Sequence, residues 1–294
     1  MNGIIIKAIG GLYIVETSDG IFECKARGIF RKKKISPVCG DKVTVTKEND
    51  GSCVIEEIQE RKSVLIRPPL ANLDILAFVC ATCDPKPNLL LLDKFIAIAE
   101  FKKIKPIIVF TKIDMRDSNE FSEIYRRAGI DVFEVNNKSG EGSDSVKNAL
   151  VGKLSAFTGN TGVGKSSLLN NMFPELELAT NEISQKLGRG KHTTRHVELY
   201  KLEDGGYIAD TPGFSSFDTN KYDIIFKDEL ADCFCEFREY LGKCRFPNCS
   251  HTKEKGCAVI DAVREGKIPQ SRFDSYVEMY EQAKLLNEWE YKND

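Results

Sequence analysis

The sequence has no apolar run that approaches the roughly 18 residues needed by a membrane-spanning helix. Its first residues, Met1–Ile6, also lack the charged and then apolar layout of a secretory signal. The chain also lacks an excess of charge of one sign. The 42 Lys and Arg stand against 44 Asp and Glu, a net charge of −2, which excludes a polycation that binds nucleic acid over its whole surface. We therefore expect a cytoplasmic protein with no membrane partner, in which any contact with nucleic acid is local.

Disulfides are not expected either, although the chain has ten cysteines. In a cytosolic protein, cysteines are more often free thiols or metal ligands than disulfide partners. What the sequence does have is length and apolar residues. With 294 residues, 41% of them hydrophobic, it is long enough for two domains with real cores, or for one large domain with appendages.

A glycine-rich stretch at residues 159–166 matches the phosphate-binding pattern G-x-x-x-x-G-K-[ST]. A strand-like run precedes it and a helix-like run follows, which is the context that this motif requires. Backbone N–H groups would hold a phosphate, Lys165 would reach the β- and γ-phosphates, and Ser166 would ligate Mg²⁺. The alternative is a glycine-rich turn with a solvated lysine. The predicted phosphate-binding set is Gly159, Asn160, Thr161, Gly162, Val163, Gly164, Lys165, Ser166 and Ser167.

The first 66 residues contain short strand-like runs separated by turn signals. These runs are Ile4–Ile9, Leu12–Glu16, Ile21–Ala26, Lys42–Lys47 and Cys53–Ile58. Five strands in so short a segment predict an OB-fold β-barrel, which often binds oligonucleotides. The basic run Arg31–Lys34 lies in the longest connection, and residues 1–70 have twelve Lys or Arg against nine Asp or Glu. This favours contact with RNA phosphates, although a solvated loop is an equal alternative for so short a run.

Strands and helices alternate between residues 67 and 222. Apolar runs predict strands at 75–80, 106–110, 131–135 and 154–158. Helical spacing appears at 89–101, 118–128 and 144–150. This alternation predicts an α/β domain with a parallel sheet and flanking helices. In front of it, Arg67-Pro68-Pro69 predicts a stiff, extended linker.

Thr111–Asp114, at the end of the second of these strands, resembles the [NT]KxD motif of GTPases. The Asp114 carboxylate can accept hydrogen bonds from guanine N1–H and the 2-amino group, a donor pair that adenine lacks, and the stem of Lys112 can cover the base. The next strand leads into Asn136–Lys138, which resembles the S-A-K element that contacts guanine O6 through a backbone N–H. A strand-end turn with solvated charges is the alternative for TKID alone. The predicted base-site set is Thr111, Lys112, Asp114, Asn137 and Lys138.

Residues 186–200 are rich in glycine and charge without an apolar period, which predicts a loop. Thr193 or Thr194 in this loop is the candidate switch threonine, and we place Thr194 with Ser166 as ligands of Mg²⁺. A hairpin follows and leads into D-x-x-G, which would put Asp210 near Mg²⁺ and the N–H of Gly213 near the γ-phosphate. The alternative for the loop is a basic connector.

Three cysteines and one histidine fall within 14 positions near the C-terminus: Cys244, Cys249, His251 and Cys257. This is a Cys₃His set suited to tetrahedral Zn²⁺, and four protein ligands leave no open position, so the ion would be structural. Coincident free thiols are the alternative. The pair Cys80/Cys83 has no histidine or second pair nearby and predicts a packing role. Cys233 and Cys235 are expected to be core or surface thiols, with a second-best ligand pair as the alternative. Residues 258–266 and 272–288 have helical periodicity.

The order of the motifs now resembles that of one family. In ordinary GTPases the phosphate loop comes first, whereas here TKID and NNKSG precede GNTGVGKS, GKHTTRH and DTPG. With a barrel in front and the Cys/His segment behind, the chain resembles the ribosome small-subunit-dependent GTPase A family, also called RsgA or YjeQ. The resemblance covers nearly the whole chain. It implies an OB-fold domain at 1–66, a circularly permuted P-loop GTPase domain at 67–222 and a helical zinc-binding domain at 223–294.

The resemblance also implies an activity. Members of this family hydrolyse GTP to GDP and phosphate, with Mg²⁺, late in assembly of the small (30S) ribosomal subunit, and that subunit stimulates them. The expected partners are the small subunit, its rRNA and GTP or GDP, and we expect a monomer.

Ras-type enzymes orient the attacking water with a glutamine just after D-x-x-G. Phe214 stands at that position here and cannot hydrogen-bond water. His192 is our candidate for positioning the water, because it lies beside Thr193. A solvated loop histidine is an equal alternative, and the ribosome is another source of the missing group. The predicted catalytic set is His192, Lys165, Thr193 and Thr194.

Two other functions stay open at this point. An RNA-binding assembly factor could use GTP binding only as a conformational latch, and Phe214 is the feature that favours this. An ATPase with a zinc-stabilised partner domain would require Asp114 to have no role in base recognition.

Overall fold

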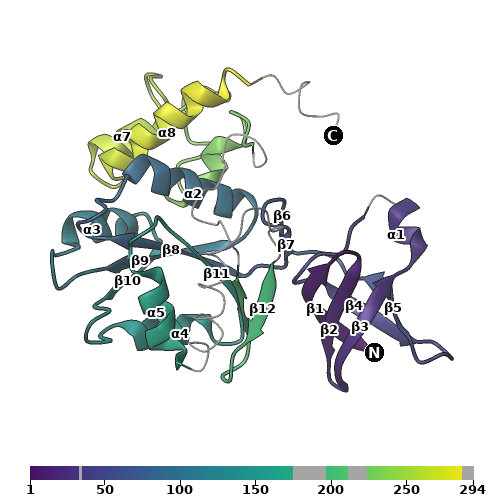
Figure 1. Ribbon diagram of the computed structural model, residues 1–294. Coiled ribbons are helices and arrows are strands. Elements are labelled where there is room, and N and C mark those ends of the chain that lie inside the picture. The colour runs from purple at the N-terminus through teal and green to yellow at the C-terminus, as the bar shows by residue number, and fades with distance from the viewer. Residues whose placement is uncertain (33–34, 175–196, 211–223, 287–294) are drawn as a thin grey trace. The chain divides into compact units, whose positions relative to one another are not determined.

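The computed structural model describes residues 1–32, 35–174, 197–210 and 224–286 (Figure 1). These residues form two compact units. The first unit comprises residues 1–77, 143–159 and the described part of 165–217. The second unit comprises residues 78–142, 160–164 and the described part of 218–294. Among the described helices, none is both long and apolar enough to cross a membrane.

The N-terminal barrel has the five strands that the sequence predicts. They are β1 (Asn2–Ile9), β2 (Leu12–Thr17), β3 (Gly20–Ala26), β4 (Lys42–Lys47) and β5 (Cys53–Ile58). The strand order β1-β2-β3-β5-β4 returns to β1, because β1 pairs with both β2 and β4. Alternate residues such as Ile5, Val15 and Ile55 have no exposed surface and build the barrel core. The expected closed five-stranded barrel is therefore confirmed.

The connection between β3 and β4 is partly helical. A short helix, α1 (Gly28–Lys32), occupies its first half, so the basic run begins inside a helix rather than in the loop we expected. Phe30 is 7% exposed and holds α1 against the barrel, whereas Lys32 is exposed. Lys33 and Lys34 lie outside the described residues.

The stiff linker predicted at Arg67–Pro69 is wrong in its conformation. Two short strands, β6 (Val64–Leu65) and β7 (Leu70–Ala71), pair in antiparallel fashion, and residues 66–69 form the turn between them. Consecutive prolines favour an extended chain when the flanking residues are free to separate. Here Val64 pairs with Ala71 and Leu65 pairs with Leu70, so the residues on either side of the prolines are held together and the chain must turn.

The rest of the first unit contains the strand before the phosphate loop and the helix after it. Strand β11 (Leu154–Thr158) runs parallel to β13 (Tyr207–Asp210), and β13 pairs in antiparallel fashion with β12 (Glu198–Lys201). Helices α4 (Ser143–Leu150) and α5 (Lys165–Met172) lie on either side of β11 in the chain. Strand β12 also pairs with β1 of the barrel, where Lys7 and Glu198 form an ion pair of 2.7 Å. The barrel strand and the phosphate-loop strand therefore belong to one continuous sheet.

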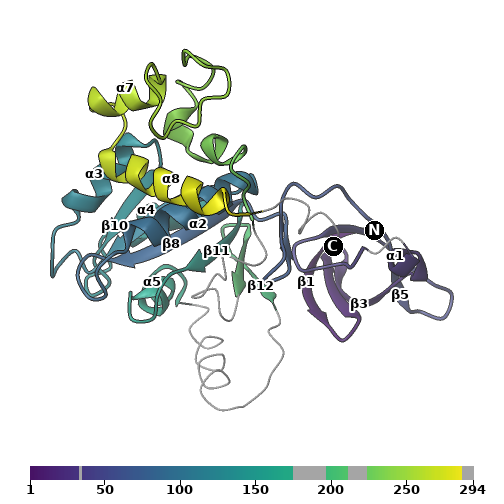
Figure 2. The same ribbon diagram turned by 90° about the horizontal axis from the view of Figure 1, so that it is seen from above.

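The second unit contains the strands that end in the base motifs. Strand β9 (Lys105–Thr111) lies between β10 (Asp131–Val135) and β8 (Ile75–Ala81), with β9 and β10 parallel. Two helices follow strands β8 and β9 in the chain, α2 (Leu89–Phe101) and α3 (Asn119–Arg127). The C-terminal part adds two 3₁₀ turns, η2 (Leu230–Cys233) and η3 (Cys235–Phe237), and two helices, α7 (Ala258–Arg264) and α8 (Gln270–Ala283). Helix α8 lies along α2 in both views (Figures 1 and 2).

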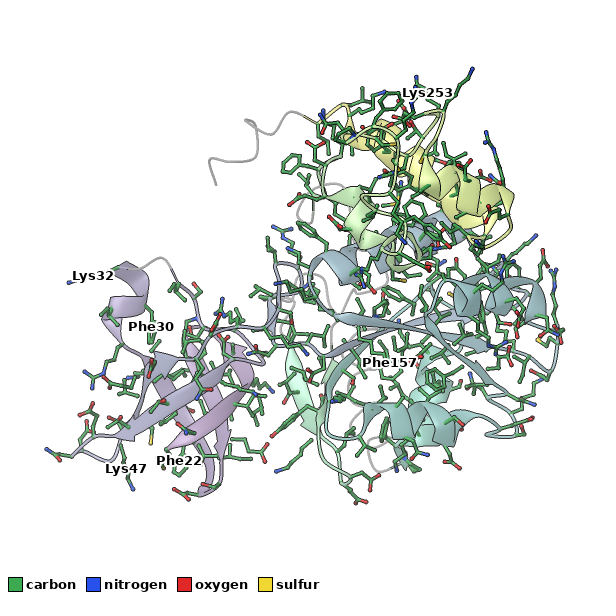
Figure 3. All side chains as sticks on the ribbon, turned by 180° about the vertical axis from the view of Figure 1, so that it is seen from behind. Phe22, Phe30, Lys32, Lys47, Phe157 and Lys253 are labelled. Atoms are coloured by element: carbon green, nitrogen blue, oxygen red, sulfur yellow. The ribbon has the colours of Figure 1, made fainter. Side chains whose placement is uncertain are left out.

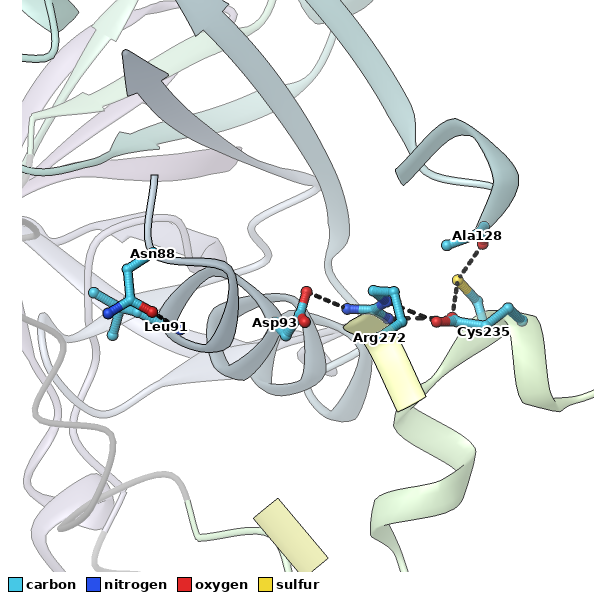
Figure 4. A network of polar contacts seen from close by, with 7 residues as sticks. Asn88, Leu91, Asp93, Ala128, Cys235 and Arg272 are labelled. Carbon is cyan, nitrogen blue, oxygen red and sulfur yellow. Dashed lines mark hydrogen bonds and ion pairs between the residues drawn. The ribbon is translucent and has the colours of Figure 1, made fainter. Parts of the chain in front are cut away.

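A buried arginine joins α8 to this unit. Arg272 has no exposed surface, and its guanidinium bonds Asp93 of α2 at 2.7 Å and Glu236 of η3 at 2.6 Å (Figure 4). Burial by itself lowers the pKa of Arg272, but the carboxylates of Glu236 and Asp93 outweigh it and hold that pKa above its ordinary value. Close by, Cys235 donates to the carbonyl of Ala128 at 2.9 Å. The C-terminal helices and α2 thus share one core.

Candidate functional site: a base motif, a phosphate loop and a Cys/His cluster

The base motif is a turn at the end of β9. Lys112 has a left-handed backbone with φ of +60°, and its carbonyl accepts a hydrogen bond from the N–H of Met115 at 2.9 Å. This closes the turn that contains Asp114. Thr111, the last residue of β9, has no exposed surface. The structure therefore places Asp114 at a strand end, where the side chains of α/β proteins meet ligands.

A second turn follows β10 and approaches the first. Its Asn136 side chain accepts the N–H of Lys138 at 3.0 Å, and the Lys138 amine forms an ion pair of 2.7 Å with Asp114. Hydrogen bonding by Lys138 holds the pKa of Asp114 below its ordinary value, and Asp114 in turn raises the pKa of Lys138. Asp114 is therefore ionised at neutral pH, which is the state that accepts hydrogen bonds from a base.

The phosphate loop connects β11 to α5. Gly159, Gly162 and Gly164 all have positive φ, a conformation that residues with a side chain rarely adopt. Val163 is buried, while Asn160, Thr161, Gly162, Ser166 and Ser167 are exposed. Helix α5 begins at Lys165, whose amine lies 3.3 Å from the carbonyl oxygen of Gly159. The loop thus ends at the start of a helix, where backbone N–H groups favour an anion.

Two hydrogen bonds, which we call the braces, tie this loop to the base motifs within the second unit. The Thr111 hydroxyl donates to the carbonyl of Val163, and the Asn137 amide donates to the carbonyl of Gly164 at 2.9 Å. In a trans peptide the C=O and the following N–H point in opposite directions. Holding these two carbonyls therefore directs the N–H groups of Gly164 and Lys165 to the other side of the loop.

The remaining residues of the predicted site are only partly described. Asp210 ends β13, whose Ala209 is level with Ala156 of β11, so its backbone lies beside the strand that leads to Gly159. His192, Thr193, Thr194, Gly213 and Phe214 lie outside the described residues.

The four predicted zinc ligands come together in the second unit. Their ligand atoms all lie within 4.8 Å of one another. The Nδ1 atom of His251 is 3.4 Å from the Sγ atoms of both Cys244 and Cys257, and these two sulfurs are 3.8 Å apart. A tetrahedral Zn²⁺ with Zn–S bonds of about 2.3 Å needs its sulfurs about 3.8 Å apart. The residues therefore fit a structural metal ion.

Neighbouring groups hold this cluster in shape. The Tyr276 hydroxyl of α8 donates to the carbonyl of Ser250 at 2.8 Å, and the Glu254 carboxylate accepts the N–H of Ser250 at 2.9 Å. Burial lowers the pKa of His251 and raises the pKa of Cys249 to about 12. Without an ion the imidazole is neutral and this thiol is protonated, so metal binding must displace a proton.

One element of the base site, the loop after β8, was not predicted from the sequence. Thr82 is fully buried and its hydroxyl donates to the carbonyl of Lys112 at 3.0 Å, while the Lys112 amine bonds the carbonyl of Asp84. These residues lie beside the Cys80/Cys83 pair, which we interpreted as packing. The available signal was the position of this loop, directly after a buried strand.

Two family models match the chain. The one described as "RsgA GTPase" matches residues 58–220, and the one described as "RsgA N-terminal domain" matches residues 2–55. The chain belongs to the RsgA GTPase family. Among its relatives, the "Small ribosomal subunit biogenesis GTPase RsgA" of Geobacillus kaustophilus is 44% identical, over 96% of this chain and 97% of the relative. The protein of that name from Clostridium beijerinckii is also 44% identical, over 98% and 100%.

Two solved structures share the fold. YjeQ from Thermotoga maritima has a TM-score of 0.81 and 32% identity, covering 97% of this chain and 99% of that chain. YloQ, described as a circularly permuted GTPase, has a TM-score of 0.79 and 38% identity, covering 96% and 94%. The predicted family and fold class are confirmed: an OB-fold barrel, a circularly permuted GTPase fold and a helical C-terminal part with a Cys/His cluster. The chain is accordingly a GTP hydrolase.

Replacing Gly164 should break a brace. A Cβ atom at Gly164→Ala would lie 2.6 Å from the Asn137 Nδ2 atom, at a φ of +90°. Strain of about 1–2 kcal/mol for a left-handed residue and loss of one hydrogen bond of about 1 kcal/mol predict GDP binding roughly 30- to 100-fold weaker. Titration calorimetry measures this. Gly129→Ala is the control, because its φ is +80° and no atom lies within 4 Å of the added Cβ. GDP affinity within about threefold of wild type in Gly164→Ala would contradict the brace.

Removing one ligand should empty the Cys/His cluster. We expect one Zn²⁺ per chain in the purified protein and none in Cys257→Ser. The loss should cost several kcal/mol of stability, each worth about 2–4 °C in Tm. Elemental analysis and thermal unfolding check both. Cys235→Ser changes a thiol outside the cluster and should retain the ion. Equal zinc content in Cys257→Ser and wild type would disprove the ligand set.

Proposed function

We propose that this chain hydrolyses GTP during late assembly of the small ribosomal subunit, and that the subunit stimulates hydrolysis. Two kinds of observation support this. Relatives named for small ribosomal subunit biogenesis match over nearly the whole length of both chains. Within the structure, the braces hold the phosphate loop directly against the two turns that contain Asp114 and Asn137.

Base selection is assigned to the second unit. The ionised Asp114 carboxylate accepts guanine N1–H and the 2-amino group, while Lys112 and Lys138 flank the base. Adenine offers no such donor pair. In an ATPase, the hydrogen bonds that fix the turn containing Asp114 would therefore have no role in base recognition. The N–H groups of residues 160–165 surround the β-phosphate, and Lys165 adds positive charge at the β- and γ-phosphates.

The hydrolytic step is assigned to groups around the γ-phosphate. Mg²⁺, when bound, neutralises charge that develops on the phosphate oxygens, and Ser166 and Thr194 are its proposed ligands, with Asp210 nearby. Gly213 offers an N–H to the γ-phosphate. His192, beside Thr193, positions the attacking water, in place of the glutamine that Phe214 replaces.

The other parts of the chain bind rRNA and preserve the fold. We assign residues 1–66 to an RNA-binding domain, 67–222 to the GTPase domain and 223–294 to a domain built around a structural Zn²⁺. Lys32 and Lys47 are exposed on the barrel, where they can meet phosphates (Figure 3). We propose that the protein is a cytoplasmic monomer and that the small subunit and its rRNA are its partners.

Nucleotide turnover with small subunits, large subunits or neither tests this function. We expect small subunits to raise GTP hydrolysis at least about tenfold, with no effect of large subunits and no hydrolysis of ATP. Lys165→Ala should abolish the stimulated rate. Single-turnover measurements separate the enzyme from a latch: if GTP stays intact on the protein with small subunits present, binding rather than hydrolysis is the function.

A further inference from the structure

The loop after β8 holds the base motif through Thr82, a residue outside the predicted base-site set. Thr82 follows β8 directly and has no exposed surface. Its N–H donates to the carbonyl of Thr111 at 3.1 Å, and its hydroxyl donates to the carbonyl of Lys112 at 3.0 Å. The backbone N–H and the hydroxyl of this one residue therefore both contact the first half of the TKID turn.

The residue that Thr82 holds is in an unfavourable conformation. Lys112 has φ of +60°, which few residues other than glycine adopt. Its carbonyl accepts the N–H of Met115 at 2.9 Å as well as the Thr82 hydroxyl, and its amine bonds the carbonyl of Asp84 in the same loop. A strained residue persists only where its surroundings determine its conformation. The loop after β8 supplies that restraint from both ends of Lys112.

This restraint acts on the base acceptor. Asp114 lies two residues after Lys112, inside the turn that the Lys112 carbonyl closes. A carboxylate can accept two hydrogen bonds from one base edge only if its plane is correctly aligned. We infer that Thr82 is a positioning residue that aligns Asp114 and so sets the discrimination between guanine and bases without a 2-amino group. The inference rests on the proposed role of Asp114.

If Thr82 had a purely structural role, its hydroxyl would only form a hydrogen bond that stabilises the fold. A structural role and a positioning role have different effects on nucleotide affinity when the hydroxyl is removed. A structural defect weakens the binding of every nucleotide by the same factor, because it lowers the fraction of competent protein. Misalignment of Asp114 weakens GDP more than inosine diphosphate, which has the N1–H donor but lacks the 2-amino group. The ratio of the two affinities is thus independent of how much of the sample is folded.

The test compares Thr82→Val with Thr82→Ser by titration calorimetry with GDP, inosine diphosphate and ADP, on the full chain with its metal. Valine keeps the shape and removes the hydroxyl, whereas serine keeps the hydroxyl. We expect the GDP preference over inosine diphosphate to fall about five- to tenfold in Thr82→Val, the worth of one hydrogen bond, and to stay at the wild-type value in Thr82→Ser.

Two results would overturn the inference, and they differ from each other. If Thr82→Val keeps the wild-type ratio, Thr82 has no positioning role and the assignment of Asp114 stands. If the wild-type protein itself binds GDP and inosine diphosphate equally, Asp114 does not read the 2-amino group, and the proposed base site fails together with the role of Thr82.

Discussion

The nucleotide site depends on the hydrogen-bond partners of two backbone carbonyls in the phosphate loop, those of Val163 and Gly164. A phosphate loop presents N–H groups to its ligand, so the carbonyls of the same peptides must find partners on the opposite side. Here those partners are the Thr111 hydroxyl for Val163 and the Asn137 amide for Gly164. Each donor is itself a residue of the base motifs. The contacts that shape the phosphate cradle are therefore the same contacts that fix its position relative to Asp114.

This arrangement makes the order of the motifs along the chain unimportant. The braces join residues 52 and 27 positions apart in the sequence, and in both cases the base motif precedes the loop. A hydrogen bond requires only that donor and acceptor meet, which the ends of the strands ensure. A permuted chain can therefore keep a GTPase site, as YloQ, described as a circularly permuted GTPase, does with the same fold. Glycine is needed at position 164, where the phosphate loop contacts Asn137, because a side chain there would collide with the Asn137 amide.

Local patterns predicted much of this from the sequence. Alternation and apolar runs located every barrel strand and the strands β8 to β11, and the spacing of cysteines and histidine predicted the Cys/His cluster that the structure assembles. The failures came from contacts that no residue pattern predicted, whether between neighbouring or distant segments. Pairing of β6 with β7 bends the Pro-Pro stretch into a turn. The role of Thr82 was not predicted, because the neighbouring Cys80/Cys83 pair indicated only packing. Arg272 resembles a surface residue in its sequence, because its partners Asp93 and Glu236 are 179 and 36 positions away.

The most direct test of a guanine site centred on Asp114 exchanges its carboxylate for an amide. Xanthine has a carbonyl where guanine has the 2-amino group, so the amide of Asp114→Asn can donate to it and still accept the N1–H. The account predicts that Asp114→Asn binds GTP about 100-fold more weakly than wild type and prefers xanthosine triphosphate over GTP. A variant that binds GTP as tightly as wild type, or that gains no preference for xanthosine triphosphate, would contradict it.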